Sequence, residues 1–275
     1  MNHKIKDRLP YLFIFLLLAA GIGFLAYPTV SDWLCRYTAR AEIAGYNRAV
    51  EEEGREKLDS MLSQAWDYNK TLNTTGASSA VSYNDLLAVT DAIGYLEIPK
   101  IGVYLPIYHG TDETVMERGI GHLPETSLPV GGVSTHCVLS GHSGLPSAKI
   151  LTRLDEMETG DLFYIHVLDE TLAYEVDQIK TVLPEETQDI QIVEGKDYVT
   201  ILTCVPYGIN THRLLVRGER TKYQPGSISV QAPEETQPEP SIEPGKLLLL
   251  GKIVLGTVLV LGTVCILLFP SKKKK

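Results

Sequence analysis

The fold is decided by residues 197–220, DYVTILTCVPYGINTHRLLVRGER, which contain two runs rich in aliphatic and β-branched residues. Such runs are typical of β-strands. The Pro-Tyr-Gly sequence at 206–208 predicts a turn between them. The first run ends close to Cys204 and the second begins at Arg213. A hairpin connection would therefore place these two residues on adjacent strands.

Runs of the same kind extend upstream to residue 93. Five of them precede the pair: IGYLEIP, VYLPIY, HCVLSG, DLFYIHV and LAYEVDQIKTVLP. The breaks between runs carry the turn-forming residues Pro99, Gly110, Gly131, Gly132, Gly160, Asp161, Gly195 and Lys196. Seven or so short strands at this spacing predict a mainly β protein with a closed or nearly closed barrel over residues 93–222. Among the strands, one short segment at 147–154 has helical character.

Residues 28–92, ahead of the predicted barrel, differ in character. Between residues 31 and 68 the chain is rich in Ala, Glu and Arg, and apolar residues recur at Leu58, Met61, Leu62, Ala65 and Trp66. This spacing predicts a helical segment. Residues 69–82 are polar and rich in Gly, Ser and Thr, which indicates a flexible loop that could act as a lid.

Two apolar runs flank this body. Residues 11–27 contain no charge, and residues 247–269 contain only Lys252. At about 1.5 Å per residue, each run is long enough to cross a hydrocarbon core of roughly 30 Å, so we expect a transmembrane helix at each end. The first run could instead be a cleaved signal peptide. The second could be a cleaved anchoring signal, although only a Pro- and Glu-rich linker at 223–246 precedes it.

Basic residues precede the first run, in the tail at 1–10, and follow the second run, in the tail at 270–275. The positive-inside rule places both tails in the cytoplasm and the body outside the cell, anchored to the cell membrane. The body, residues 28–245, carries 33 Asp and Glu against 16 Lys and Arg, a formal charge of −17. That charge argues against nucleic acid as a partner.

Of the four cysteines, Cys35 lies just outside the first apolar run and Cys265 lies inside the second. Only Cys137 and Cys204 belong to the predicted barrel, so no disulfide framework is indicated. A cysteine at a strand end beside a turn is held rigidly and can still be reached, which makes Cys204 a candidate nucleophile. The structural alternative is a buried free cysteine.

His142 lies in LSGHSG, residues 139–144, where a predicted strand runs into a turn flanked by glycines. Glycines allow close backbone approach and leave the imidazole open. A structural role is the alternative, and six other histidines compete with it: His3, His109, His122, His136, His166 and His212. Arg213 has its own competitor in Arg217, which lies on the same face of the strand by the period of two.

Taken together, SGH at 140–142, TILTC at 200–204 and Arg213 resemble the sortases of Gram-positive bacteria. The segments GLPSAK (144–149) and PYGINTHRLLVRG (206–218), with the second apolar run, resemble the pilin-polymerising class C branch in particular. The resemblance covers about residues 30–222. It implies an eight-stranded sortase β-barrel preceded by N-terminal helices, with neither cofactor nor metal.

The resemblance also implies the chemistry. Cys204 would be the nucleophile, His142 the acid/base and Arg213 the oxyanion donor. Thr203, Ser140 and Tyr207 would support the site or contact substrate. The enzyme would cleave an LPXTG-like sorting signal between Thr and Gly and transfer the acyl group to an amine, above all a pilin lysine. Its partners would be pilins or surface proteins that carry such signals.

Two features depart from the class C pattern. Ile201 stands where leucine is usual. No proline occurs between Pro28 and Pro99, so the Asp-Pro-aromatic lid motif of class C is absent, and Trp66 with Asp67 is the nearest substitute.

Other functions stay open from the sequence. A sortase of another class, anchoring surface proteins to peptidoglycan, is the nearest alternative. An L,D-transpeptidase would need an arginine where Pro206 stands. A non-enzymatic surface adhesin would explain the predicted topology but not the Cys/His/Arg set. A metal site would draw on His136, Cys137, His142 and Cys204, which lack typical ligand spacing.

Overall fold

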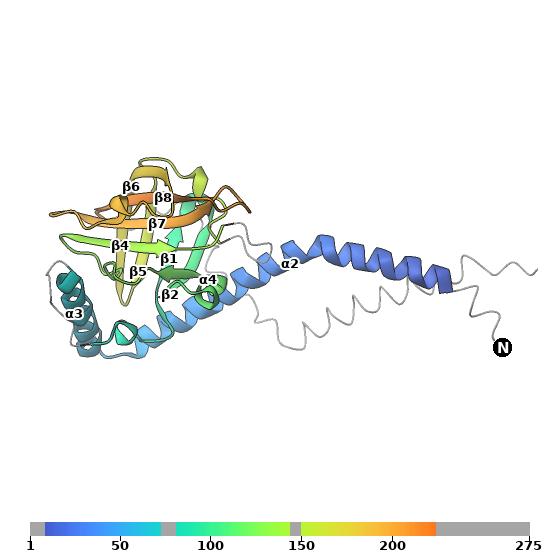
Figure 1. Cartoon of the computed structure of the whole chain (residues 1–275). Coiled ribbons are helices and arrows are strands. Elements are labelled where there is room, and N and C mark those ends of the chain that lie inside the picture. The colour runs from blue at the N-terminus through green and yellow to red at the C-terminus, as the bar shows by residue number, and fades with distance from the viewer. Residues whose placement is uncertain (1–8, 73–80, 144–149, 224–275) are drawn as a thin grey trace, which may run out of the picture. The chain divides into compact units, whose positions relative to one another are not determined.

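The computed structural model describes residues 9–72, 81–143 and 150–223 (Figure 1). Thr29–Val230 forms one compact unit, and the site described below lies within it. Several predicted features lie outside the described residues: the second membrane helix, the basic tail after it, the linker from residue 224 onward and the GLPSAK segment.

The N-terminal helix α2 spans Leu9–Glu52 as one element of 44 residues. The sequence suggested a boundary at Pro28, but Pro28 lies inside the helix. A proline removes one backbone hydrogen bond and bends a helix, but α2 continues through Pro28. Within the described residues, one helical stretch, Phe15–Glu52, is long and apolar enough to cross a membrane, judged by length and composition.

The C-terminal half of α2 packs against the barrel. Four side chains at intervals of three or four residues are buried there: Ala39, Ile43, Tyr46 and Val50. The Tyr46 hydroxyl accepts a hydrogen bond from the backbone N–H of Leu168 at 2.7 Å and donates to the carbonyl of Ile93 at 3.4 Å. This part of the helix is fixed on the barrel by one buried apolar stripe and by the hydrogen bonds of Tyr46 to two barrel segments.

Helix α3, Arg55–Leu72, confirms the predicted helical spacing, since Leu58, Leu62 and Ala65 are buried along one face. The loop predicted from residue 69 is wrong at its start, because Asn69 still belongs to this helix and is 2% exposed. Its amide donates to the carbonyl of Leu128 at 3.2 Å and accepts from the Leu128 N–H at 2.7 Å. A buried amide satisfied by backbone groups costs little, so a polar residue near the end of the helix is accommodated in the protein interior.

Eight strands form a closed barrel in the order β1-β2-β3-β4-β7-β8-β6-β5. Their bounds are β1 Ala92–Ile98, β2 Val103–His109, β3 Ile120–His122, β4 Thr135–Ser140, β5 Leu162–Val167, β6 Glu170–Val182, β7 Asp197–Val205 and β8 His212–Thr221. All seven predicted strands are present, and the predicted barrel is confirmed. Strand β3 was not predicted, because three residues are too few to show a period.

Short helices occupy the connections between strands. They are α4 Glu113–Arg118, η1 Tyr83–Asp85, η2 Pro99–Ile101, η3 Leu154–Glu156 and η4 Gln188–Ile190. The helical character expected at 147–154 is wrong for its described part, where turns and bends lead into η3. Buried Ile150 and Leu151 give that stretch its apolar pattern by packing against the barrel, not by helix formation.

Candidate active site

Strand β7 is the centre of the site, with β4 on one side and β8 on the other. Strands β7 and β8 are antiparallel, and their register pairs Cys204 directly with Arg213. Directly paired residues project on the same face of a sheet. The hairpin inferred from the sequence is therefore confirmed, and it places these two side chains next to each other.

Strand β4 brings the third residue. It runs parallel to β7 with Ser140 opposite Leu202, a separation of 62 residues. Pairing continues beyond the strand, because Gly141 N–H donates to the Leu202 carbonyl at 3.1 Å. Continuing this register by two residues sets His142 opposite Cys204. His142, Cys204 and Arg213 thus form a row across three neighbouring strand ends.

Thr203 ties the first two strands together at this point. Its hydroxyl is buried and donates to the Gly141 carbonyl at 2.7 Å. Gly141 has no room for a side chain, since a Cβ there would lie 2.7 Å from Leu151 and 2.8 Å from Ile120. The backbone just before His142 is therefore held in place by a hydrogen bond and by close packing.

Alternation along β7 separates two faces. Val199, Ile201 and Thr203 are buried in the barrel interior, so Cys204 belongs to the opposite face and is half-buried. Cys137, the other cysteine of the barrel, packs in the interior core and is 2% exposed. Burial raises the pKa of the Cys137 thiol well above its usual value. A thiol is nucleophilic only as thiolate, so the structure favours Cys204.

The face that carries Cys204 is covered farther down by the β6–β7 connection. His136 bridges the two, with one ring nitrogen 2.7 Å from the Thr200 hydroxyl and the other 2.8 Å from the Gln191 carbonyl. Burial lowers the pKa of His136. Because both ring nitrogens are engaged, and Cys137 faces the interior, the four residues considered for a metal site do not converge.

The two competing arginines have different environments. Arg217 makes a bidentate ion pair with Asp177 at 3.0 and 2.6 Å, and its guanidinium lies 4.2 Å from the centre of the Tyr198 ring. Arg213 donates to the carbonyls of Asn210 and His212 at 3.0 and 3.1 Å. Within the described part of the chain, no carboxylate pairs with Arg213. The structure therefore gives Arg217 a structural partner and leaves Arg213 donors for a ligand.

Trp66 and Asp67 do not approach this site. The Trp66 indole donates to the Val130 carbonyl at 3.3 Å, and Asp67 pairs with Lys70 at 2.9 Å. Helix α3 lies beside the beginning of β4, whereas the site is at its end (Figure 1). The interpretation of this pair as a substitute lid anchor is wrong.

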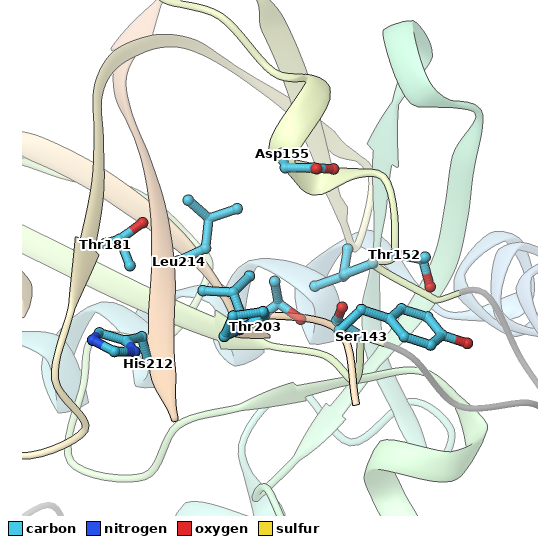
Figure 2. A pocket seen from close by; sticks show the side chains of 11 residues that line it. Ser143, Thr152, Asp155, Thr181, Thr203, His212 and Leu214 are labelled. Carbon is cyan, nitrogen blue, oxygen red and sulfur yellow. The ribbon is translucent and has the colours of Figure 1, made fainter. Parts of the chain in front are cut away.

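A cavity of about 460 Å³ opens next to the row, at the end of the barrel. Figure 2 shows Asp155, Thr203, Thr181 and His212 around it. Thr203 and Tyr207 line it, and Tyr207 is 61% exposed. The sequence did not single out Thr152, Asp155 or Thr181, because Thr152 and Asp155 come from the connection before β5 and Thr181 comes from β6. His212 could have been found from its place beside Arg213.

A closed barrel with a cysteine, a histidine and an arginine on adjoining strand ends defines a cysteine acyltransferase. The family model described as "Sortase domain" matches residues 96–221, the stretch that forms this barrel. The chain belongs to the sortase family of cysteine transpeptidases. Membership of this family argues against the adhesin and L,D-transpeptidase alternatives.

Relatives and solved structures agree with this assignment. Sortase D of Bacillus subtilis is 33% identical over 132 residues, 47% of this chain and 64% of that protein. Sortase A of Streptococcus agalactiae is 26% identical over 80% of this chain and 87% of that protein. The crystal structure of sortase C1 from Streptococcus agalactiae is 45% identical, with a TM-score of 0.63, over 67% of this chain and 100% of that one.

A structure of Clostridium perfringens sortase C with its C-terminal cell wall sorting motif matches equally well, at 45% identity and a TM-score of 0.63, over 67% of this chain and 100% of that one. Streptococcus pneumoniae sortase C, whose structure is described in terms of pilin substrate specificity, is 44% identical over 67% of this chain and 99% of that one, with a TM-score of 0.63. Among sortases, the chain is thus placed with class C.

Proposed function

We propose that this sortase is a membrane-anchored transpeptidase that cleaves an LPXTG-like signal between Thr and Gly and joins it to a pilin lysine. The observation that carries the proposal is the row of His142, Cys204 and Arg213 across β4, β7 and β8. The sorting motif in the Clostridium perfringens structure and the pilin specificity discussed for the Streptococcus pneumoniae enzyme support the substrate class.

The first half of the reaction forms an acyl-enzyme. His142 takes the proton of Cys204, and the resulting thiolate attacks the carbonyl carbon between Thr and Gly. Arg213 donates to the oxyanion that develops on this carbonyl. His142 then gives its proton to the leaving glycine amine as the peptide bond breaks. Cys204 is left as a thioester of the threonine carboxyl group.

The second half consumes the thioester. A neutral amine attacks the same carbonyl, again facing Arg213, and Cys204 departs as a thiolate. The proton released by the amine passes to His142 and from there to the Cys204 thiolate, which restores the starting thiol and neutral imidazole. Thr203 supports both halves by fixing the backbone before His142, and the exposed Tyr207 lines the neighbouring cavity. Ser140 of β4 lies opposite Leu202 of β7 and is therefore on the same face of the sheet as Cys204.

Mass spectrometry of the full chain in detergent tests the function. Incubation with LPXTG-like peptides, without an amine, is expected to add the mass of the acyl fragment to Cys204. Adding a lysine derivative is expected to remove that mass and yield an amide product. A peptide of the same composition in scrambled order is the control. An adduct on another cysteine, or none with any peptide of this form, would contradict the proposal.

The proposed topology has its own test. Basic residues flank both apolar runs, so both termini are expected to face the cytoplasm. A protease added to intact protoplasts is expected to digest the barrel and to spare a tag at either end. Protoplasts opened with detergent serve as the control, in which both tags are lost. Loss of one tag from intact protoplasts would show that its apolar run is inverted or cleaved.

A further inference from the structure

The cavity next to the row lies on the other side of β7 from the Cys204 face. It is lined by Thr203 and Val205, which flank Cys204 in sequence and alternate with it. Ser143, the neighbour of His142, lines it as well. A molecule in the cavity would therefore border both the nucleophile and the acid/base without occupying the face on which Cys204 lies. Transpeptidation uses two substrates, the sorting signal that forms the thioester and the amine that attacks it. The cavity offers a place for the second.

The lining has a distinct chemistry. Asp155 is its carboxylate, and none of the described residues that line it is a lysine or an arginine. Hydroxyl groups of Ser143 and Thr181 add acceptors, and Leu151, Val205 and Leu214 give apolar walls. In Figure 2 Asp155 lies across the hollow from Thr203. The combination of apolar walls with one anionic acceptor suits a cation carried on an aliphatic chain.

Asp155 is placed by its neighbours but is not neutralised by them. It is exposed and lies in η3, between the fully buried Leu154 and the exposed Glu156. Arg153 binds Glu156 with two hydrogen bonds at 2.7 and 2.6 Å. Among the described residues, no cation pairs with Asp155. Because Arg153 is paired with Glu156, the charge of Asp155 stays available to a ligand.

We infer that this cavity is the site of the acceptor, and that Asp155 recognises the ammonium group of an incoming lysine. The inference rests on the proposed function and names the subsite for its second substrate. A lysine side chain carries three N–H donors on a flexible four-carbon stem. The stem fits the apolar walls, and the donors fit the Asp155 carboxylate with the nearby hydroxyls. Asp155 binds the acceptor as an ammonium ion when it first docks and takes no part in acylation. The nitrogen then gives this proton to solvent and moves past the end of β7 to attack the thioester as a neutral amine.

The test separates the two half-reactions in the full chain in detergent. Asp155→Asn is expected to leave the rate of acyl-enzyme formation unchanged. It is expected to raise the KM for Nα-acetyl-lysine methylamide by about fivefold, the size expected for one partly exposed ion pair. Consumption of the thioester by hydroxylamine, which is small and uncharged at neutral pH, is expected to stay the same. Glu185→Gln makes the same change of charge at an exposed residue outside the cavity and is expected to leave all three values unchanged.

Binding gives a readout that does not depend on turnover. In a Cys204→Ala background, the affinity for the same lysine derivative, followed by NMR, is expected to fall about fivefold with Asp155→Asn. An unchanged affinity and an unchanged KM would overturn the inference, and so would equal losses for the lysine derivative and hydroxylamine. If the wild-type protein forms no acyl-enzyme, the proposed function fails, while the binding measurement still decides whether the cavity holds an ammonium group.

Discussion

Replacing Cys204 with alanine is expected to abolish acyl-enzyme formation. The residue ends β7 beside Arg213, it is half-buried, and it belongs to the face opposite the packed interior. Without its sulfur no thioester can form, and the remaining groups act only on the uncatalysed attack of water. Loss of a nucleophile in other acyl transferases costs several orders of magnitude in kcat. Mass spectrometry with a sorting peptide, together with a peptide cleavage assay, measures the loss.

Cys137→Ala is the matched control. Its sulfur is buried in the interior of the barrel, so removing it deletes one packed atom and is expected to lower the free energy of unfolding by about 1 kcal/mol. Most of the cleavage activity is expected to remain. Cys35→Ala, on α2 and partly buried against the hydrophobic core, provides a second control. A Cys204→Ala protein that still forms an adduct would remove Cys204 from the mechanism.

Strand positions could be predicted from the sequence, because aliphatic runs and turn residues are local signals. The pairing of strands was predictable where the connection is short. Cys204 and Arg213 are separated by one short connection, and their adjacency followed from the pattern. His142 is different, because its place opposite Cys204 depends on a parallel register between segments 62 residues apart. No local pattern specifies such a register, so the resemblance to known sortases was needed to connect the histidine with the cysteine.

The errors have a common cause. Asn69 was assigned to a loop because its surroundings are polar, but the backbone of Leu128 satisfies its amide inside the protein. Trp66 was considered near the nucleophile, but its indole binds Val130 at the other end of β4. No sequence pattern marked Asp155 as a cavity residue, because the cavity forms only when Thr203 and Ser143 from distant segments come together with it. In each case a tertiary contact decided the role of a residue that the sequence described only locally.

Arg213→Lys is expected to lower kcat by two to three orders of magnitude. Lysine keeps the positive charge but loses the planar fork of donors, and removal of one well-placed oxyanion donor costs roughly 3 kcal/mol. The Arg213 guanidinium is held by the carbonyls of Asn210 and His212, and Arg213 is paired with Cys204 in the strand register. Stability is expected to change little, because within the described part of the chain no carboxylate loses its partner. Steady-state cleavage rates and thermal unfolding measure the two effects.

Arg217→Lys is expected to show the reverse pattern. Arg217 holds Asp177 through two hydrogen bonds and stacks on the Tyr198 ring, and its side chain is 17% exposed. Lysine can keep one contact to Asp177 but not the bidentate geometry or the stacking. We expect the free energy of unfolding to fall by about 1 kcal/mol and kcat to stay within about threefold, roughly 0.6 kcal/mol in activation free energy. Because both substitutions exchange arginine for lysine on the same strand, a general effect of the exchange would appear in both proteins. Equal losses of kcat would therefore show that the effect does not depend on a donor aimed at the oxyanion. In that case the role proposed for Arg213 would be wrong.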